Sequence, residues 1–272
     1  MIRPEQPNYP RLGVNVSQMT STDRHWEKSA KENPYFGVLS DPKFFSANLN
    51  EELLQEFFSS GERHIEHVFR TVRESVKPAF RPVRVLDYGC GVGRLLVPLA
   101  NRSQEVTGVD VSPSMLIQAR ENCDRLCASS VCLLHVDDLR TLAPSTFDLV
   151  HSFIVFQHIP VARGELILSR LIELIAKGGV GAIHITFRDT HSAIRRNLRA
   201  LRQRIPLVHG MINLARGRRY STGMSQMNSY SMNRIFETLI KSQCSNLHVE
   251  FSDHGGFLGA MLYFEKSPKV LL

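Results

Sequence analysis

The chain has 272 residues and a mass of 30.8 kDa, with 43% apolar and 22% charged residues. This composition is typical of one large globular domain with a small appendage, and it excludes a disordered chain because it supplies enough apolar residues for a core. The longest apolar stretch, residues 166–176, contains charged residues and is far too short to span a membrane. Five scattered cysteines and an N-terminus without a hydrophobic segment predict a reduced, cytoplasmic protein.

The net charge of +7 originates in one short window. Residues 188–219 contain nine arginines but a single acidic residue, Asp189, so the rest of the chain is close to neutral. We therefore interpret the basic excess as a local site, and not as the chain-wide character that favours binding to nucleic acid.

The first 82 residues are expected to form a helical N-terminal cap. Apolar residues follow helical spacing in residues 51–58 and again, after Gly61, in residues 65–72. Pro78 and Pro82 punctuate the end of this region.

From residue 83 onward, short apolar runs alternate with helical segments. Strands are expected at residues 83–88, 105–110, 131–135, 147–155 and 180–187, with helices at 95–100, 112–125 and 162–176 between them. A helix at 231–242 and a hairpin of strands 247–251 and 257–264 follow the basic window. This order predicts an α/β fold with a doubly wound, mostly parallel sheet of seven strands.

The most informative segment is the glycine turn after the first expected strand. Gly89, Gly91 and Gly93 let the backbone bend sharply and approach a ligand closely. A dinucleotide fingerprint would need glycine at position 94, where the chain has Arg94. Asp87, at the end of the strand, would repel a pyrophosphate but attract a ligand that carries an ammonium and a sulfonium group.

Two further acidic positions follow the next strands. Asp110 ends the second strand, 17 residues after Gly93, where an acid hydrogen-bonds both ribose hydroxyls in such folds. The alternative for Asp110 is an acid at a helix N-terminus beside Ser112. Residues 136–139, after the third strand, either face an adenine amino group or form a plain turn.

Three motifs together resemble the class I S-adenosylmethionine-dependent methyltransferases: the turn at residues 87–93, the segment 108–116 and the segment 147–150. The resemblance covers about residues 83–187 and implies a Rossmann-like methyltransferase fold with S-adenosylmethionine as cofactor. Residues 26–39, 157–160 and 253–256 also resemble one bacterial branch of the family that often accompanies glycan and natural-product pathways.

The resemblance implies a role for each matching position. Gly89 and Gly91 would pack against the methionine and ribose portion, Val111 and Met115 would flank the adenine, and residues 152–158 would line the methyl-transfer end. The cofactor-binding set implied in this way is Asp87, Gly89, Cys90, Gly91, Gly93, Arg94, Asp110, Val111, Met115, Asp137, Asp138, Leu139, Ser152 and Phe153.

Methyl transfer to an alcohol needs a base, and His158 is the first candidate because it follows the fourth strand at the ligand-binding edge. The alternative for His158 is a helix cap or a bond to backbone. His254 in the hairpin is a second candidate, whereas His184 inside the fifth strand is more typical of a satisfied buried histidine. Tyr35 could close over the cofactor or substrate, or else pack in the core.

The sequence lacks the motifs that accompany methylation of several classes of acceptor. Residues 152–158 contain neither the Asn/Asp-Pro-Pro-Tyr/Phe run that accompanies base amino-group methylation nor the paired glutamates of protein arginine methyltransferases. Neither the acids nor the cysteines have the spacing of a metal site, so no metal is expected.

Residues 188–229 are predicted to be a basic lid inserted after the fifth strand. Ile194, Leu198, Leu201 and Ile205 form one apolar stripe on a helix, and most arginines fall off that stripe. Three interpretations remain open: a surface helix packed on the domain, an arginine-lined lid for an anionic substrate such as a phosphate-linked sugar, or contact with a membrane surface. Nucleic acid is least favoured, because no aromatic residues alternate with these arginines.

The sequence thus predicts a cap over residues 1–82 and a class I methyltransferase domain over residues 83–272. The expected reaction is transfer of a methyl group to a small-molecule or sugar acceptor that could be anionic, most simply at oxygen. The alternatives are a non-methyl use of S-adenosylmethionine, by cyclisation or aminoalkyl transfer, and a non-catalytic binding protein. The sequence makes no prediction of oligomeric state, and it favours neither nucleic acid nor a membrane as partner.

Overall fold

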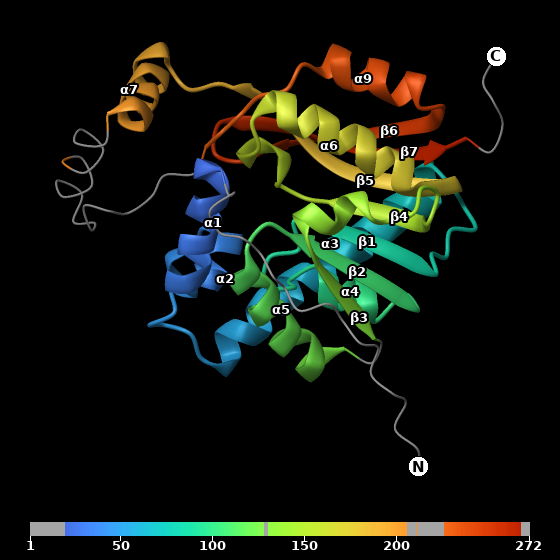
Figure 1. The fold of residues 1–272 in the computed structure, drawn as a ribbon, viewed down its shortest axis with the longest axis horizontal. Coiled ribbons are helices and arrows are strands. Elements are labelled where there is room, and N and C mark those ends of the chain that lie inside the picture. Colours follow the sequence, from blue (N-terminus) through green and yellow to red (C-terminus); the bar gives the residue numbers. More distant parts are fainter. Residues whose placement is uncertain (1–19, 128–129, 206–210, 212–225, 268–272) are drawn as a thin grey trace.

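The computed structural model describes residues 20–127, 130–205, 211 and 226–267 of the chain. Its centre is a seven-stranded sheet with the strand order β3-β2-β1-β4-β5-β7-β6 (Figure 1). The first five strands are parallel, and β7 runs antiparallel to β5 and β6. The predicted doubly wound, mostly parallel α/β sheet is therefore confirmed. The strands are β1 (Arg84–Tyr88), β2 (Glu105–Asp110), β3 (Val131–His135), β4 (Phe147–Ser152), β5 (Ile175–Asp189), β6 (Cys244–Asp253) and β7 (Phe257–Lys266).

The end of β4 differs from the sequence prediction. The strand was expected to run to Val155 but ends at Ser152, because Ile154 has a positive φ of 59° that extended backbone cannot continue. A short 3₁₀ turn, η4 (Phe156–His158), follows immediately. The segment after β4 therefore folds back over the carboxyl ends of the strands instead of extending the sheet.

Helices cover both faces of the sheet. α3 (Glu51–Ser75), α4 (Leu96–Ala100) and α5 (Pro113–Leu126) pack on one face, with Ile65, Val68 and Leu116 in a shared core with Val85. α6 (Val161–Leu174) and α9 (Met232–Lys241) cover the other face (Figure 1). This three-layer arrangement buries the sheet on both sides, as its nearly continuous apolar strands require.

α3 is a single helix of 25 residues and does not break at Gly61. A Cβ atom on Gly61 would lie 2.1 Å from the carbonyl oxygen of Arg94. The glycine therefore marks a close approach between α3 and the segment after the glycine turn.

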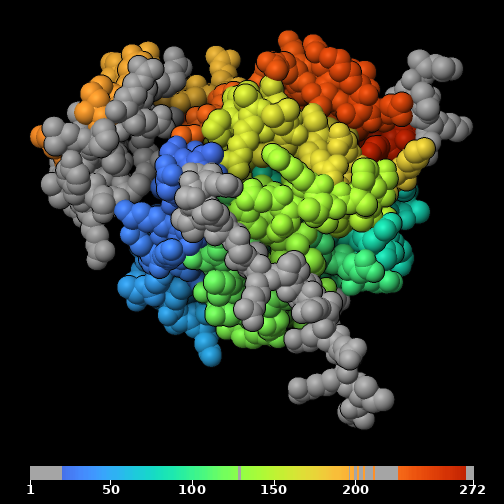
Figure 2. Space-filling model, viewed as in Figure 1, coloured from blue at the N-terminus to red at the C-terminus, as the bar shows by residue number. Residues whose placement is uncertain are grey.

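The N-terminal cap consists of α1 (Ser21–Glu32), α2 (Pro34–Val38) and the 3₁₀ turn η2 (Pro42–Phe44). Thr20 and Asp23 form a capping box that fixes the start of α1. The cap has its own small core, which joins it to α3 and α5: Ala30, Tyr35, Phe44, Phe57, Val92 and Met115. Figure 2 shows the cap, in blue, on the surface beside the green segments of the sheet domain. Because α3 belongs to the main core, only the elements before it behave as an appendage.

α7 (Ala193–Arg204) is the described part of the basic insertion. Its apolar stripe faces solvent: Ile194 is 80% exposed, and Leu198, Leu201 and Ile205 are each more than 40% exposed. Figure 1 shows this helix standing apart from the sheet. The interpretation as a helix packed on the domain through this stripe is therefore wrong. Arg216, Arg218 and Arg219 lie outside the described residues, as do the side chains of Arg196, Arg199, Arg202 and Arg204.

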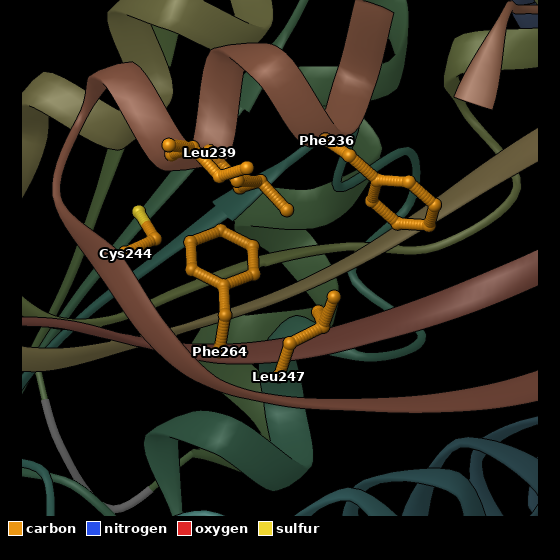
Figure 3. Close-up of a pocket in the computed structure, with 6 residues that line it drawn as sticks. Phe236, Leu239, Cys244, Leu247 and Phe264 are labelled. Atoms are coloured by element: carbon orange, nitrogen blue, oxygen red, sulfur yellow. The ribbon is translucent and has the colours of Figure 1, made fainter. Parts of the chain in front are cut away.

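An apolar cavity of about 340 Å³ lies between α9 and the β6–β7 hairpin (Figure 3). Its lining residues are Phe236, Leu239, Ile240, Cys244, Leu247 and Phe264. The cavity sits at the β6 edge, separated from β1 by β4 and β5, and it shares no residue with the glycine turn. A small polar nucleoside would find few hydrogen-bond partners in this cavity, so the cavity does not fit the ligand that the glycine turn predicts.

No helix in the described ranges is both long and apolar enough to cross a membrane. All five cysteines fall within those ranges, and each is a free thiol.

Candidate functional site

The glycine turn after β1 has the backbone conformation that its residues predicted. Gly89, Gly91 and Gly93 have φ values of 79°, 53° and 91°, which other residues adopt only with strain. A Cβ atom on Gly89 would lie 2.3 Å from a methyl group of Val155, and one on Gly91 would lie 2.8 Å from a methyl group of Val38. The segment after β4 and the cap therefore close on the turn from two sides.

Asp110 lies at the end of β2, beside this turn. Its Oδ2 accepts a hydrogen bond from the Gly91 N–H at 2.9 Å, and its Oδ1 accepts one from the Ser112 N–H at 2.9 Å. Burial raises the pKa of Asp110 above its ordinary value, although these N–H groups oppose the shift. The backbone thus holds the carboxylate rigidly at the position from which an acid binds ribose hydroxyls.

Arg94 is a buried cation on the other flank of the turn. Its side chain is only 7% exposed, and one guanidinium nitrogen donates to the Ser60 hydroxyl at 3.3 Å. The Nε atom is buried without an acceptor, and burial lowers the pKa of Arg94 to about 10. Among the described residues no carboxylate forms an ion pair with it, so this site fits a ligand that supplies an anionic group.

Asp87, at the end of β1, has a partner that the sequence did not suggest. Its Oδ1 lies 2.8 Å from Nδ1 of His151 on β4, and both side chains are almost completely buried. Asp87 and His151 are neighbours in the β1–β4 register. This oxygen of Asp87 is therefore engaged by a histidine, and its implied role beside the amino group of the cofactor stays a prediction.

Four residues of the implied cofactor set have side chains that point into packed interior. Cys90 and Leu139 are each 4% exposed and belong to the two main core clusters. Met115, 3% exposed, packs in the core of the cap. Ser152 is fully buried and donates to the Tyr88 carbonyl at 2.9 Å. These side chains serve packing or, for Ser152, a hydrogen bond to the backbone, and their implied contact with the cofactor stays a prediction.

The segments after β2 and β3 are linked by His135, which sequence reasoning missed. Its Nε2 lies 3.0 Å from the Val111 carbonyl, and its Nδ1 accepts from the Asp137 N–H at 3.3 Å. The Asp137 side chain is exposed, and Asp138 is half-buried. Their contact with an adenine edge, like that of Val111, stays a prediction.

His158, the first candidate for the base, has both ring nitrogens engaged. Nδ1 lies 2.9 Å from the Gln226 carbonyl, which can only accept, so Nδ1 carries the proton. Nε2 then accepts from the Gln157 amide at 3.1 Å. Burial lowers the pKa of His158 to about 4, and its ring meets Trp26 at 4.8 Å. We therefore reassign His158 from the base to the network that fastens η4, the alternative that the sequence left open.

Tyr35, which could have closed over the cofactor or substrate, is a packing residue, and so is Tyr230. The Tyr35 hydroxyl is buried and donates to Asn122 at 3.0 Å, and Asn122 in turn donates to the Val92 carbonyl at 2.8 Å. The Tyr230 hydroxyl faces the carbonyls of Phe156 and Ile159. Tyr35 is therefore corrected from a catalytic candidate to a residue that joins the cap to α5.

His254 and His184 lie at the carboxyl end of β4, together with Phe153. The two imidazole rings are 5.1 Å apart, and the Phe153 ring is within 6.0 Å of both. Nε2 of His184 lies 2.9 Å from the Ser252 hydroxyl, as expected for a satisfied buried histidine, whereas Nε2 of His254 is buried without a partner. Burial lowers the pKa of His184 to about 3 and also lowers that of His254. The role of His254 at this end of the site stays a prediction.

The cap bridges the two sides of the strand ends through α1. Asp23 pairs with Arg163 of α6 at 2.8 Å, and Glu27 accepts from the hydroxyls of Ser112 and Ser114, both at 2.7 Å, at the start of α5. Burial alone would raise the pKa of Glu27, but these hydrogen bonds outweigh it and lower the pKa below 4.5. α1 is therefore fastened across the edge of the sheet where open α/β folds bind ligands.

Comparison with known proteins assigns this architecture to a family. Residues 85–179 match the family described as "Methyltransferase domain". The chain carries a methyltransferase domain. This domain spans β1 to the start of β5 and includes the glycine turn, Asp110 and the segment after β4. Its fold is that of the class I, S-adenosylmethionine-dependent methyltransferases, as the motifs predicted.

Relatives of the methyltransferase domain act on different acceptors. The 23S rRNA (uracil(1939)-C(5))-methyltransferase of Shewanella sediminis is 42% identical over 73 residues, 27% of this chain and 16% of that protein. The ubiquinone biosynthesis O-methyltransferase of Azorhizobium caulinodans is 30% identical over 130 residues, 48% of this chain and 49% of that protein. The match thus covers from a sixth to half of these relatives.

Solved structures share the fold over most of the chain. One is magnesium protoporphyrin IX methyltransferase from Synechocystis with bound S-adenosylmethionine, which has a TM-score of 0.58 at 15% sequence identity. The superposition covers 92% of this chain and 99% of that protein. The N-methyltransferase NodS from Bradyrhizobium japonicum has a TM-score of 0.55 at 14% identity, covering 91% and 99%.

The residues around the glycine turn fit S-adenosylmethionine. Arg94 is a buried cation whose Nε lacks an acceptor, which suits the carboxylate of the amino-acid portion. Asp110 is held where it can accept from ribose hydroxyls. The positive φ values of the glycines let the backbone bend sharply at this point, with Val155 and Val38 packed against Gly89 and Gly91. When bound, the cofactor supplies an electrophilic methyl group.

Proposed function

We propose that this protein transfers a methyl group from S-adenosylmethionine to an oxygen atom of a small-molecule or sugar acceptor that carries an anionic group. The observation that supports it most directly is the position of Arg94 and Asp110, which lie on opposite flanks of the glycine turn. Together they match the carboxylate and the ribose of this cofactor, and a dinucleotide would meet the acidic flank unfavourably.

Methylation at oxygen is favoured by the chemistry of the strand ends. A hydroxyl group must lose its proton as it attacks, whereas amine and thiolate nucleophiles need little beyond positioning. Buried imidazoles with lowered pKa values gather at the carboxyl end of β4, and such imidazoles are neutral at physiological pH. A neutral imidazole has a lone pair that can take up the proton of an alcohol, provided that a partner group carries the proton onward.

An anionic acceptor is supported by the basic insertion. Arg188 and Arg195 are exposed at or beside the start of α7, and the exposed apolar stripe of this helix is free to contact a ligand. A guanidinium group binds phosphate with two parallel hydrogen bonds, which a phosphate-linked sugar would use. The similarity to an rRNA methyltransferase extends over 73 residues, 27% of this chain and 16% of that protein, and we do not carry its acceptor over to this chain.

The test follows the fate of the cofactor. The purified protein is incubated with methyl-labelled S-adenosylmethionine and a bacterial small-molecule extract, with or without phosphatase treatment, and the products are identified by mass spectrometry. We expect S-adenosylhomocysteine and an equal amount of labelled O-methyl product, reduced after phosphatase treatment. Formation of methylthioadenosine without a methylated product would instead indicate aminoalkyl transfer or cyclisation, and no consumption despite binding would indicate a non-catalytic protein.

A second arm distinguishes a free acceptor from one held at a lipid surface. The protein is sedimented with vesicles of phosphatidylcholine alone and of phosphatidylcholine with phosphatidylglycerol. Binding to the anionic vesicles only, lost in Ile194→Asp but kept in Leu166→Asp, would move the proposal to a lipid-linked acceptor. Leu166 is the matched control because it is 74% exposed on α6, away from α7.

A further inference from the structure

Four histidines from four separate elements gather at the carboxyl end of β4, and three of them, His64, His184 and His254, lie around Phe153. His64 comes from α3, His151 from β4 and His184 from β5, and His254 lies in the turn between β6 and β7. The His64 ring is 4.1 Å from Phe153, and the His184 ring is 5.4 Å from it. In the described part of the chain no three metal-binding side chains are arranged to hold one ion.

Two of these histidines form a chain with an aspartate. Asp87 Oδ1 lies 2.8 Å from His151 Nδ1, and His151 Nε2 lies 3.3 Å from His64 Nε2. Asp87 and His151 are register partners on β1 and β4, the two strands between which the sheet order reverses. Open α/β sheets bind their ligands outside the carboxyl ends of the strands at this point.

The hydrogen bonds fix which nitrogen carries each proton. The Asp87 carboxylate only accepts, so His151 Nδ1 donates to it, and in the neutral ring Nε2 has the lone pair. His64 Nε2 must then donate to His151 Nε2, which leaves the lone pair of the neutral His64 ring on Nδ1. None of the hydrogen bonds formed by the described residues engages that Nδ1 atom. A chain of three residues thus presents one free lone pair.

The surroundings of His64 keep its ring neutral. Burial, followed by the nearby groups His151, Arg94, His67 and His184, lowers the pKa of His64 to about 2. His64 alone is therefore a poor place to store a proton. His151, in contrast, has the carboxylate of Asp87 at hydrogen-bond distance, so a proton that reaches its ring meets a neighbouring carboxylate.

We propose that His64, His151 and Asp87 form a proton relay that activates the hydroxyl group of the acceptor. The inference rests on the proposed function and names the base for it. The acceptor oxygen forms a bond to the methyl carbon while the carbon–sulfur bond breaks and its electron pair remains on sulfur. The hydroxyl proton passes to His64 Nδ1, the proton on His64 Nε2 passes to His151 Nε2, and the positive charge comes to rest on His151 beside Asp87. His64 is the catalytic residue, and His151 and Asp87 are positioning residues.

The first test measures the protons themselves and needs no acceptor. Protein labelled with ¹⁵N-histidine, alone and with S-adenosylhomocysteine, is studied by two-bond ¹H–¹⁵N correlation spectra. We expect His151 protonated on Nδ1 and His64 protonated on Nε2, with both assignments altered in Asp87→Asn. A wild-type His64 protonated on Nδ1 would overturn the relay, because its free lone pair would then face His151 and not the acceptor.

The second test uses the extract fraction that the wild-type protein methylates. His64→Ala should lower kcat by about 10²–10⁴-fold with little change in the KM for S-adenosylmethionine, and added imidazole should restore part of the rate. His64→Gln, which keeps a donor toward His151 but has no basic nitrogen, should stay inactive.

His248→Ala is the matched control and should remain within about threefold of wild type, because it removes a partly exposed imidazole of β6 that lies beside Glu250 and not in the relay. Retained S-adenosylhomocysteine binding shows that each variant is folded. His64→Ala with a rate close to wild type, or a loss that imidazole does not restore, would overturn the relay. Absence of methyl transfer by the wild type would count against the proposed function and leave the spectra to decide the proton arrangement.

Discussion

The backbone at Gly61 touches the backbone at Arg94: a Cβ atom at position 61 would lie 2.1 Å from the Arg94 carbonyl oxygen. This contact holds α3 against the segment that carries the buried guanidinium group. The same region of α3 supplies Ser60, which accepts from Arg94, and His64, one helical turn further along. α3, which lies outside the glycine turn, therefore places side chains at both ends of the candidate site.

Gly61→Ala should lower the free energy of unfolding by about 1–3 kcal/mol, because the added methyl group meets backbone that cannot move alone. Alanine normally stabilises a helix relative to glycine, so the sign of the effect is diagnostic. Urea unfolding provides the measurement. Arg63→Ala, at an exposed position of the same helix, should change stability by less than about 0.5 kcal/mol. A stabilising Gly61→Ala would contradict the close approach.

Arg94→Gln should weaken binding of S-adenosylhomocysteine by about 1.5–3 kcal/mol, because a charge-assisted hydrogen bond to the ligand carboxylate is lost. Methylthioadenosine lacks that carboxylate, and its affinity should not change. Calorimetry with both ligands measures the difference. Arg63→Gln, which alters an exposed arginine, serves as the control. An equal loss for both ligands would show that Arg94 acts on the fold of the turn and not on the carboxylate.

Asp110→Ala should weaken the binding of S-adenosylhomocysteine and of methylthioadenosine alike, by about 1–3 kcal/mol, because both ligands contain the ribose. The contrast with Arg94→Gln separates the two ends of the cofactor in one set of titrations. Asp124→Ala removes an exposed carboxylate from α5 and should leave both affinities unchanged. Wild-type affinity in Asp110→Ala would discard the ribose assignment.

Glu27→Gln should lower the free energy of unfolding at pH 7 by about 1–3 kcal/mol, because the hydroxyls of Ser112 and Ser114 lose an ionised acceptor. The pKa of Glu27 is lowered in the folded state, so its contribution is present above the unfolded value of 4.5 and disappears as the pH falls through the folded value.

Unfolding at several pH values should therefore show the wild type and Glu27→Gln converging below about pH 4.5. Glu32→Gln, at an exposed position of the same helix, should follow the wild-type curve. A constant difference between wild type and Glu27→Gln at every pH would mean that the ionised form of Glu27 does not matter.

Local sequence patterns were sufficient to predict the sheet, the conformation of the glycine turn and the position of Asp110 at the end of β2, since each depends on residues close together in the chain. Positive φ at Gly89, Gly91 and Gly93 and the acid that ends β2 follow from the same short motifs. The same reasoning could not explain Gly61, because the reason for the glycine is the backbone of a segment more than 30 residues away.

The candidate histidines show the same difference between what a local sequence pattern predicts and what tertiary contacts decide. His158 drew attention because it follows β4, yet its ring nitrogens are taken by Gln157 and by Gln226, nearly 70 residues later. His64 and His151 stand in a helix and a strand with no motif around them, 87 residues apart, and only packing brings them within 3.3 Å. The amino-acid order thus determines which ligand the turn after β1 suits, since a turn is a local object. Which imidazole offers a free lone pair is decided by the tertiary structure, because that depends on partners that the fold gathers from distant strands and helices.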